Sequence, residues 1–286
     1  MITRKDIMNE VQSRGYQIEA CDKVKNGVTI DGIGMLKWED VGIFIPVNEI
    51  LKWDENTLRG YGNEKEHIQK IADRIINMYE TCDECKMRLE DLKNRDYILG
   101  HINIGLQKTS TQDFVKKPCP YFDKVEEYLY ISQEDGTAGR YYMPVKENLL
   151  EQSGVSESEA WEAAKKNLHD NVVLETMQEA LEAVAGIKVD FLFLEEEFPM
   201  YIMSNKYSMY GASSVLDNEI LKQLALDCGT DTLVLIPASI HEVLIFPNTE
   251  DYSVDEMRMM VMAVNAEEVA PQDQLSDEPY LWKLEN

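Results

Sequence analysis

Several pairs of β-prone runs in this chain are joined by links of only a few residues. Asn26-Gly27 separates the first pair, and this dipeptide is a strong signal for a two-residue hairpin. Links this short cannot hold a crossover helix, so they force the neighbouring strands to pair antiparallel. The pairs are residues 16–20 with 28–33, 127–132 with 140–145, and 232–236 with 241–246.

Helical periodicity and capping residues predict that helices alternate with these strands. Ser156 with Glu159, and Ser253 with Glu256, have the spacing of a capping box at a helix start. Such intermixing of helices with antiparallel strands predicts an α+β fold, mainly antiparallel sheet flanked by helices. Helices are expected at residues 3–14, 63–79, 156–168, 217–228 and 253–264, and in a segment carrying Leu174, Met177, Leu181 and Val184.

A domain boundary is expected in LysLysProCysPro, residues 116–120, because two prolines beside charged residues disfavour regular structure. It divides the chain into two lobes, an N-terminal α+β lobe at 1–116 and a C-terminal α+β lobe at 117–286. Residues 97–106 alternate loosely and predict a strand. The segment after Pro271 carries prolines and acidic residues, and we expect it to wrap loosely over the surface.

The formal net charge of −25 restricts the partners that a chain of this kind can bind. A surface this negative repels phosphates, so it opposes a direct grip on the backbone of DNA or RNA. For the same reason it opposes binding to anionic membranes. An acidic surface is typical of a soluble protein, but it would also suit an inhibitor that imitates nucleic acid, or docking to a basic partner.

The distribution of apolar residues and cysteines predicts a cytoplasmic protein. The first sixteen residues contain no apolar segment of the kind found in signal peptides, and the apolar run 232–246 is interrupted and too short to span a bilayer. The five cysteines are irregularly spaced, which indicates reduced thiols and no disulfide.

The sequence carries few of the motifs that hold metals or cofactors. A phosphate-binding loop, a dinucleotide fingerprint and a nucleophile elbow are all missing. Cys82 and Cys85 form a CxxC pair, but no second CxxC or close histidine pair completes four ligands. We therefore expect no metal and no cofactor.

Ser239, His241 and Glu242 are the residues most suggestive of catalysis. Ser239 and His241 would share one face of a strand, so they could form an activated nucleophile with Glu242 as the orienting group. Glu242 would point to the opposite face, however, and adjacent residues on a strand rarely reach the angles of a triad. The other interpretation is a tight strand connection in which Ser239 bonds to the backbone and His241 is half-buried.

Asn205 and Lys206 are a second candidate binding pair, because they follow a predicted strand and precede Gly211. Such strand ends are common ligand positions, and Asn with Lys could hold a carboxylate or a phosphate. The alternative is a simple turn with a solvated lysine. Gly211 and the small residues after it would then allow close packing onto the sheet.

Several blocks of this chain resemble an uncharacterised family from gut Gram-positive (Firmicutes) bacteria, a domain of unknown function. The resemblance covers most of the chain and implies no reaction. The blocks are TyrIleMetSerAsnLys at 201–206, Tyr210-Gly211-Ala212, LeuIleProAlaSerIleHisGluVal at 235–243, AsnAlaGluGluValAlaPro at 265–271 with Leu275-Ser276-Asp277, and ValSerGluSerGluAlaTrpGluAlaAla at 155–164.

Three functional hypotheses follow from these observations. The leading one is a non-enzymatic cytosolic protein that engages a protein or peptide partner, with Asn205, Lys206, Ser239, His241 and Glu242 as candidate binding residues. One alternative is a hydrolase-like enzyme that uses Ser239, His241 and Glu242. The other is an acidic inhibitor that imitates nucleic acid.

Overall fold

The computed structural model describes residues 2–36, 42–47, 50–51, 63–81, 90–135, 139–185, 200–237, 239–247, 253–267 and 269–284. Within these residues helices are intermixed with antiparallel sheets, so the predicted α+β fold is confirmed. The chain divides into two compact units, Met1–Lys86 and Met87–Asn286. None of the described helices is both long and apolar enough to cross a membrane.

The first unit is built on a three-stranded antiparallel sheet in the order β1-β2-β3. Asn26 and Gly27 join β1 to β2 with φ values of 51° and 79°, so the predicted hairpin is confirmed. Positive φ at both turn positions is typical of the type I′ turn that Asn-Gly favours. The described elements are α1 (Arg4–Ser13), β1 (Glu19–Lys25), β2 (Val28–Leu36), β3 (Gly42–Pro46) and α3 (Glu64–Thr81).

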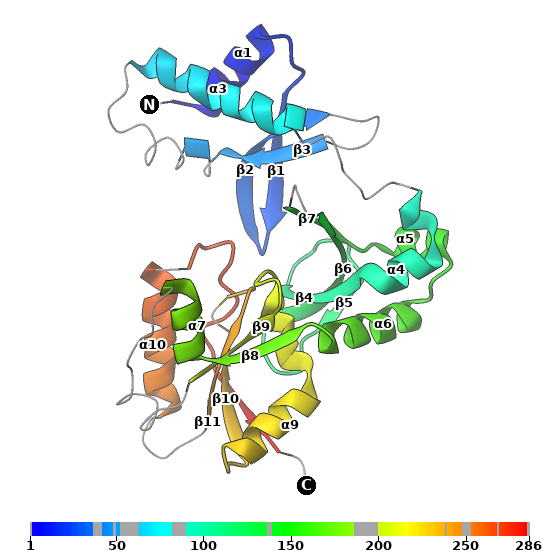
Figure 1. The fold of residues 1–286 in the computed structure, drawn as a ribbon, viewed down its shortest axis with the longest axis vertical. Coiled ribbons are helices and arrows are strands. Elements are labelled where there is room, and N and C mark those ends of the chain that lie inside the picture. The colour runs from blue at the N-terminus through cyan, green and yellow to red at the C-terminus, as the bar shows by residue number, and fades with distance from the viewer. Residues whose placement is uncertain are drawn as a thin grey trace. The chain divides into compact units, whose positions relative to one another are not determined.

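Two helices cover this sheet and supply half of its core. Figure 1 shows α1 and α3 side by side. The side chain of Asn63 accepts hydrogen bonds from the amides of Lys65 and Glu66, as predicted for the start of α3. The core joins the apolar faces of both helices to one face of the sheet, with Ile7, Val11, Ile33, Ile45, Ile71, Ala72 and Ile75 all buried.

The second unit begins with a sheet in which β6 lies at the centre. β4 pairs with one side of β6, and β5 and β7 pair with it as well, all antiparallel. The elements of this part are η1 (Asp91–Lys93), α4 (Arg95–His101), β4 (Ile102–Lys108), β5 (Lys116–Pro118), β6 (Val125–Asp135), β7 (Gly139–Pro144), α5 (Glu147–Ser153) and α6 (Glu157–His169).

Two expectations for this region differ from the structure. The predicted strand at 97–106 is a helix up to His101, because the side chain of Asn94 accepts hydrogen bonds from the amides of Asp96 and Tyr97 and caps α4. Its second half, residues 102–106, lies in the strand β4 as predicted. The expected break at 116–120 contains the strand β5. A short strand at a sheet edge tolerates proline, since the missing N–H can face away from the partner strand.

The pairing of β4 with β6 also explains where the chain divides. Residues 102–108 bond to residues 125–131 across the boundary that the sequence suggested at 116/117. The segment from Met87 onward therefore belongs to the second unit, and the division falls earlier in the chain than expected.

A second sheet of five antiparallel strands completes this unit, in the order β12-β10-β11-β9-β8. Its β10–β11 pair is the predicted apolar pair. Leu174, predicted in a helix, lies in β8, and the helix begins at Met177. The elements are β8 (Val172–Thr176), α7 (Met177–Ala185), β9 (Tyr201–Asn205), η2 (Gly211–Leu216), α9 (Asn218–Asp227), β10 (Thr232–Ile236), β11 (Val243–Pro247), α10 (Val254–Glu267) and β12 (Tyr280–Lys283).

Both faces of this sheet are buried, which explains the continuous apolar run of β10. Leu233 and Leu235 pack with Leu221 and Leu224 of α9 in one cluster. Val234 and Ile236 pack on the other face with Met257 and Val261 of α10. Alternate residues of a strand point to opposite faces, so a strand covered on both sides needs apolar residues throughout.

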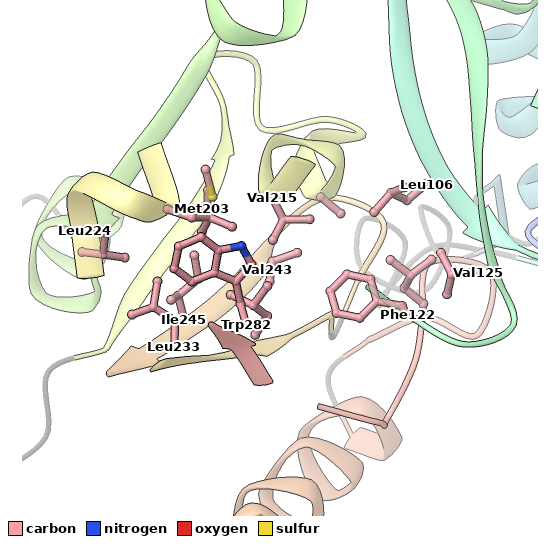
Figure 2. Packing of buried hydrophobic residues seen from close by; sticks show 14 of the residues in the cluster. Leu106, Phe122, Val125, Met203, Val215, Leu224, Leu233, Val243, Ile245 and Trp282 are labelled. Atoms are coloured by element: carbon pink, nitrogen blue, oxygen red, sulfur yellow. The ribbon is translucent and has the colours of Figure 1, made fainter. Parts of the chain in front are cut away.

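The C-terminal segment is part of the core, and the expectation that it wraps loosely is wrong. β12 pairs with β10, and Trp282 is only 7% exposed. Figure 2 shows the Trp282 indole among Leu224, Leu233 and Ile245. Strand pairing to β10 and burial of the indole together hold this segment against the sheet.

The short helix η2 ties the two sheets of the second unit together. The Ser213 hydroxyl donates to the carbonyl of Ile104 in β4 over 2.6 Å, and the Ser214 hydroxyl donates to the carbonyl of Ser204 in β9 over 2.8 Å. Gly211, at the start of η2, is buried against β9. The small residues after Tyr210 therefore allow the close packing that the sequence suggested.

Candidate functional site

Ser239 organises the connection between β10 and β11. Its side chain is almost fully buried, and its Oγ accepts hydrogen bonds from the amides of His241 at 3.0 Å and Glu242 at 3.2 Å. The C-terminal segment closes the same loop, since Ile240 N donates to the carbonyl of Asp273 and Ser239 bridges to Gln274. Ser239 is therefore the centre of a turn.

The ring nitrogens of His241 meet groups other than Ser239. Nδ1 accepts a hydrogen bond from the amide of Tyr210 at 3.2 Å, and Nε2 lies 3.6 Å from Oδ1 of Asp273. A nucleophile of the serine–histidine kind needs a hydrogen bond between the hydroxyl and the imidazole. Glu242 is exposed. These contacts favour the turn interpretation of the three residues.

Asn205 and Lys206 form a turn of their own next to this loop. The Asn205 side chain accepts from Tyr207 N at 3.0 Å and donates to the carbonyl of Met209 at 2.8 Å. The Lys206 ammonium lies 4.8 Å from the centre of the Tyr207 ring. The Asn205 side chain is thus occupied within its own turn, as Asn often is in turns.

The two candidate groups are neighbours through their backbones. The Ser204 hydroxyl donates to the carbonyl of His241 over 2.7 Å. A Cβ at Gly211 would lie 2.6 Å from the amide nitrogen of Asn205 and 2.7 Å from the carbonyl oxygen of His241. The structure therefore brings the turn at 205–209 and the loop at 239–242 together at Gly211, through contacts that stabilise the fold.

Replacing Ser239 with alanine should lower the free energy of unfolding by about 1 kcal/mol, because two amides lose their shared acceptor. Chemical denaturation of the full chain measures this change. Ser158→Ala is the matched control, since Ser158 lies exposed on α6 and alanine suits a helix. A Ser239→Ala protein as stable as this control would contradict the turn interpretation.

A cleft of about 730 Å³ lies elsewhere in the second unit. It is lined by parts of β4, β5 and β6, the C-terminal turn of α6 and the N-terminal turn of α9. Ile104, Leu168 and Leu216 form its apolar part. Clefts of this size, apolar with a few convergent polar groups, are typical ligand sites.

A histidine–aspartate pair stands on one side of this cleft. His169 Nδ1 lies 2.6 Å from Oδ2 of Asp217, whose side chain is only 5% exposed. The other oxygen of Asp217 caps α9 by accepting from the amides of Glu219 and Ile220. The hydrogen bond to Asp217 raises the pKa of His169 above its ordinary value, and Nε2 is the ring nitrogen left for a ligand.

A lysine–glutamate pair also lines the cleft. Lys117 Nζ lies 3.2 Å from Oε2 of Glu127, and the same ammonium lies 4.0 Å from the centre of the Trp161 ring. The side chain of Glu127 is only 5% exposed. Burial raises the pKa of Glu127, although the nearby Lys117 and Lys165 ammonium groups oppose this shift.

Two further lysines of the cleft have no partner of this kind. Lys165 and Lys166 are exposed in the last turns of α6, and neither forms an ion pair with any residue that the structure describes. Because the C-terminal end of a helix carries a partial negative charge, the positive charges of these lysines are also favourable there. The cleft's three lysines and three carboxylates cancel, and a protonated His169 adds one positive charge, whereas the whole chain carries −25.

The cleft was not predicted from the sequence, although two pairs of adjacent lysines hinted at it. The lysine pairs 116–117 and 165–166 stand out in a chain with 28 basic and 53 acidic residues. The first pair lies in the segment that was interpreted as a domain boundary, and the second lies in the helix expected at residues 156–168. Only the packing of α6 on β4 and β6, with β5 paired to β6, shows that Lys117 and the second lysine pair line one cleft.

In the ranges that the structure describes, His, Cys, Asp and Glu side chains form no group of three or more that could hold a metal ion. Cys21, Cys119 and Cys228 are free thiols. The CxxC pair at Cys82 and Cys85 lies outside the described residues.

Comparison with protein families identified a family model that matches this chain. A sequence model described as Family of unknown function (DUF5688) matches residues 2–283, so it spans both compact units. Comparison with curated proteins and with solved structures found no match. The resemblance to a domain of unknown function is therefore confirmed at the level of the family.

Proposed function

The chain belongs to DUF5688, a family of unknown function, and we propose that it is a non-enzymatic protein that binds a protein or peptide partner. The bound segment of that partner carries a carboxylate next to an apolar side chain. It occupies the cleft between β5, α6 and α9, with its carboxylate at Lys165 and Lys166.

The observation that carries this proposal is a pair of lysines, beside an apolar surface, that form no ion pair with any described residue. Lys165 and Lys166 can each donate to an anion, and His169 Nε2 adds a further donor when the ring is protonated. Apolar side chains at the same cleft favour a ligand that is not purely ionic. An acidic residue next to an apolar residue in a peptide has both properties.

The charge of the chain supports a ligand with few negative charges. A net charge of −25 repels a polyanion at long range, which disfavours nucleic-acid backbones and anionic membranes. One or two carboxylates experience less of this repulsion, and screening by salt reduces it further. The cleft itself is close to neutral, so a local attraction can prevail there.

The contacts of Ser239 and His241 favour a non-enzymatic protein over the hydrolase-like alternative. The Ser239 hydroxyl accepts from two amides, and the His241 ring meets Tyr210 N and Asp273.

We also propose a cytoplasmic location, because Cys21, Cys119 and Cys228 are free thiols, as is usual in a reducing compartment.

An array of randomised hexapeptides would test this proposal with the full chain. We expect the captured peptides to carry Asp or Glu beside an apolar residue. The double variant Lys165→Ala/Lys166→Ala should bind the best peptide about tenfold more weakly, as expected for the loss of two exposed ion pairs. Fluorescence anisotropy of the labelled peptide measures the affinity.

Lys222→Ala/Lys283→Ala is the matched control, since it removes the same charge from exposed positions outside the cleft. Its affinity for the peptide should stay close to that of the unmodified protein. Captured peptides without acidic residues, or an equal loss of affinity in both double variants, would contradict the proposal.

A further inference from the structure

A second hollow of about 640 Å³ adjoins the cleft. The two share one wall, which consists of Lys117, Pro118, Pro120 and Tyr121 and is called the ridge below. The ridge begins in β5 and continues into the loop before β6. A ligand longer than the cleft can therefore pass over the ridge into the second hollow.

Contacts of Tyr121 hold the ridge against neighbouring segments. Tyr121 donates its hydroxyl hydrogen to Oδ1 of Asn218 at 2.6 Å, and its ring lies 5.2 Å from that of Tyr280. Pro118 and Pro120 fix φ at their positions. A preformed wall loses little conformational entropy when a ligand binds, which favours affinity.

The backbone of the ridge is poorly suited to pairing with an added strand. Pro118 and Pro120 have no N–H, so a partner strand would find few donors along this edge. Recognition across the ridge must therefore depend on the side chains at its two sides.

Among the described residues, the second hollow offers one lysine that forms no ion pair. Its Lys116 ammonium lies 3.2 Å from Oε1 of Glu126, and Lys117 is paired with Glu127. Lys124 is exposed and forms no ion pair with a described residue, although the carboxylate of Asp123 is its neighbour in sequence. The three lysines of this hollow outnumber its two carboxylates by one.

The backbone holds Lys124 in an unusual conformation. Its φ is 58°, in the left-handed region that few residues other than glycine, asparagine and aspartate adopt. The carbonyl of Lys124 accepts a hydrogen bond from Thr109 N at 2.8 Å, which fixes the turn. Lys124 therefore occupies a position where asparagine or glycine would fit the backbone conformation better.

We propose that the partner segment is extended and bridges both hollows, with one acidic residue at Lys165 and Lys166 and a second at Lys124. This inference rests on the proposed function and specifies the kind of segment that is bound. The ridge extends from residue 117 to residue 121, and five residues of extended chain span at most roughly 17 Å. We therefore expect about four or five residues between the two acidic positions.

Two synthetic peptides derived from the best hexapeptide test the inference. One carries a second Glu five residues after the first, and the other carries Gln at that position. We expect the two-acid peptide to bind the full chain about threefold more tightly, as one additional exposed ion pair would provide. In the Lys124→Asn variant the two peptides should bind equally.

Asparagine tolerates positive φ, so Lys124→Asn removes the charge without straining the turn. Zero-length carbodiimide coupling followed by mass spectrometry gives an independent measurement. We expect the two-acid peptide to couple both to Lys124 and to Lys165 or Lys166. The one-acid peptide should couple only to Lys165 or Lys166.

The outcomes separate this inference from the proposed function. If both peptides bind the unmodified protein equally and Lys124 does not couple, the bridging inference is wrong. The proposed function still holds in that case if binding of the one-acid peptide depends on Lys165 and Lys166. If binding of neither peptide depends on those two lysines, the proposed function fails as well.

Discussion

Replacing Trp282 with alanine should lower the free energy of unfolding of the second unit by about 3–5 kcal/mol, the range measured when large aromatic side chains are removed from cores. The indole is 7% exposed and packs in the cluster of Leu224, Leu233 and Ile245 (Figure 2). Its Nε1 also donates to Oδ1 of Asn218 at 3.1 Å. The substitution removes both the packing and this hydrogen bond.

Urea denaturation of the full chain, followed by circular dichroism, measures the effect. Leu281→Ala is the matched control, because Leu281 precedes Trp282 in β12 but is 40% exposed. This control should cost less than about 1 kcal/mol, since little apolar area is lost. Equal stability of the two variants would mean that the C-terminal strand does not belong to the core.

Replacing Gly211 with alanine should cost about 3 kcal/mol or more, at the upper end of what overpacking costs. The new Cβ would lie 2.3 Å from Oγ of Ser204, 2.6 Å from the amide nitrogen of Asn205 and 2.7 Å from the carbonyl oxygen of His241. Two of these atoms belong to the backbone of β9 and of the β10–β11 connection. They cannot move without disturbing the sheet.

Gly100→Ala is the control for this prediction. Gly100 lies near the end of α4, where an added Cβ would meet nothing within 4 Å. Alanine should be neutral there or stabilise the helix by up to about 1 kcal/mol. The midpoints of thermal unfolding of both variants measure the difference, and a Gly211→Ala protein that unfolds at the midpoint of Gly100→Ala would contradict the close packing.

Local signals in the sequence predicted much of the fold correctly. The Asn26-Gly27 hairpin, the capping boxes at Ser156 and Ser253, and the helix that starts at Asp217 all occur as expected. Each depends on groups that lie within a few residues of one another. Such contacts form in almost any tertiary context, so the residues alone indicate them.

Predictions based on short, weakly patterned segments were less successful. Residues 97–101 were expected in a strand, but the Asn94 cap starts a helix there. Trp282 was expected in a loose tail, but a four-residue strand joins it to β10, about fifty positions earlier in the chain. A strand this short has too few residues to show a period, and its partner strand determines its structure.

The candidate residues named from the sequence depend on local contacts, whereas the cleft depends on contacts between distant segments. For Ser239 and Asn205 the turn was one of two interpretations that the sequence offered, and it could be foreseen because their hydrogen bonds are local. The cleft depends on Lys117, Lys165 and Asp217, which come from β5, α6 and the cap of α9. Their distances are set by how the helices pack on two different sheets, and side chains a hundred positions apart carry no local pattern that would reveal this packing.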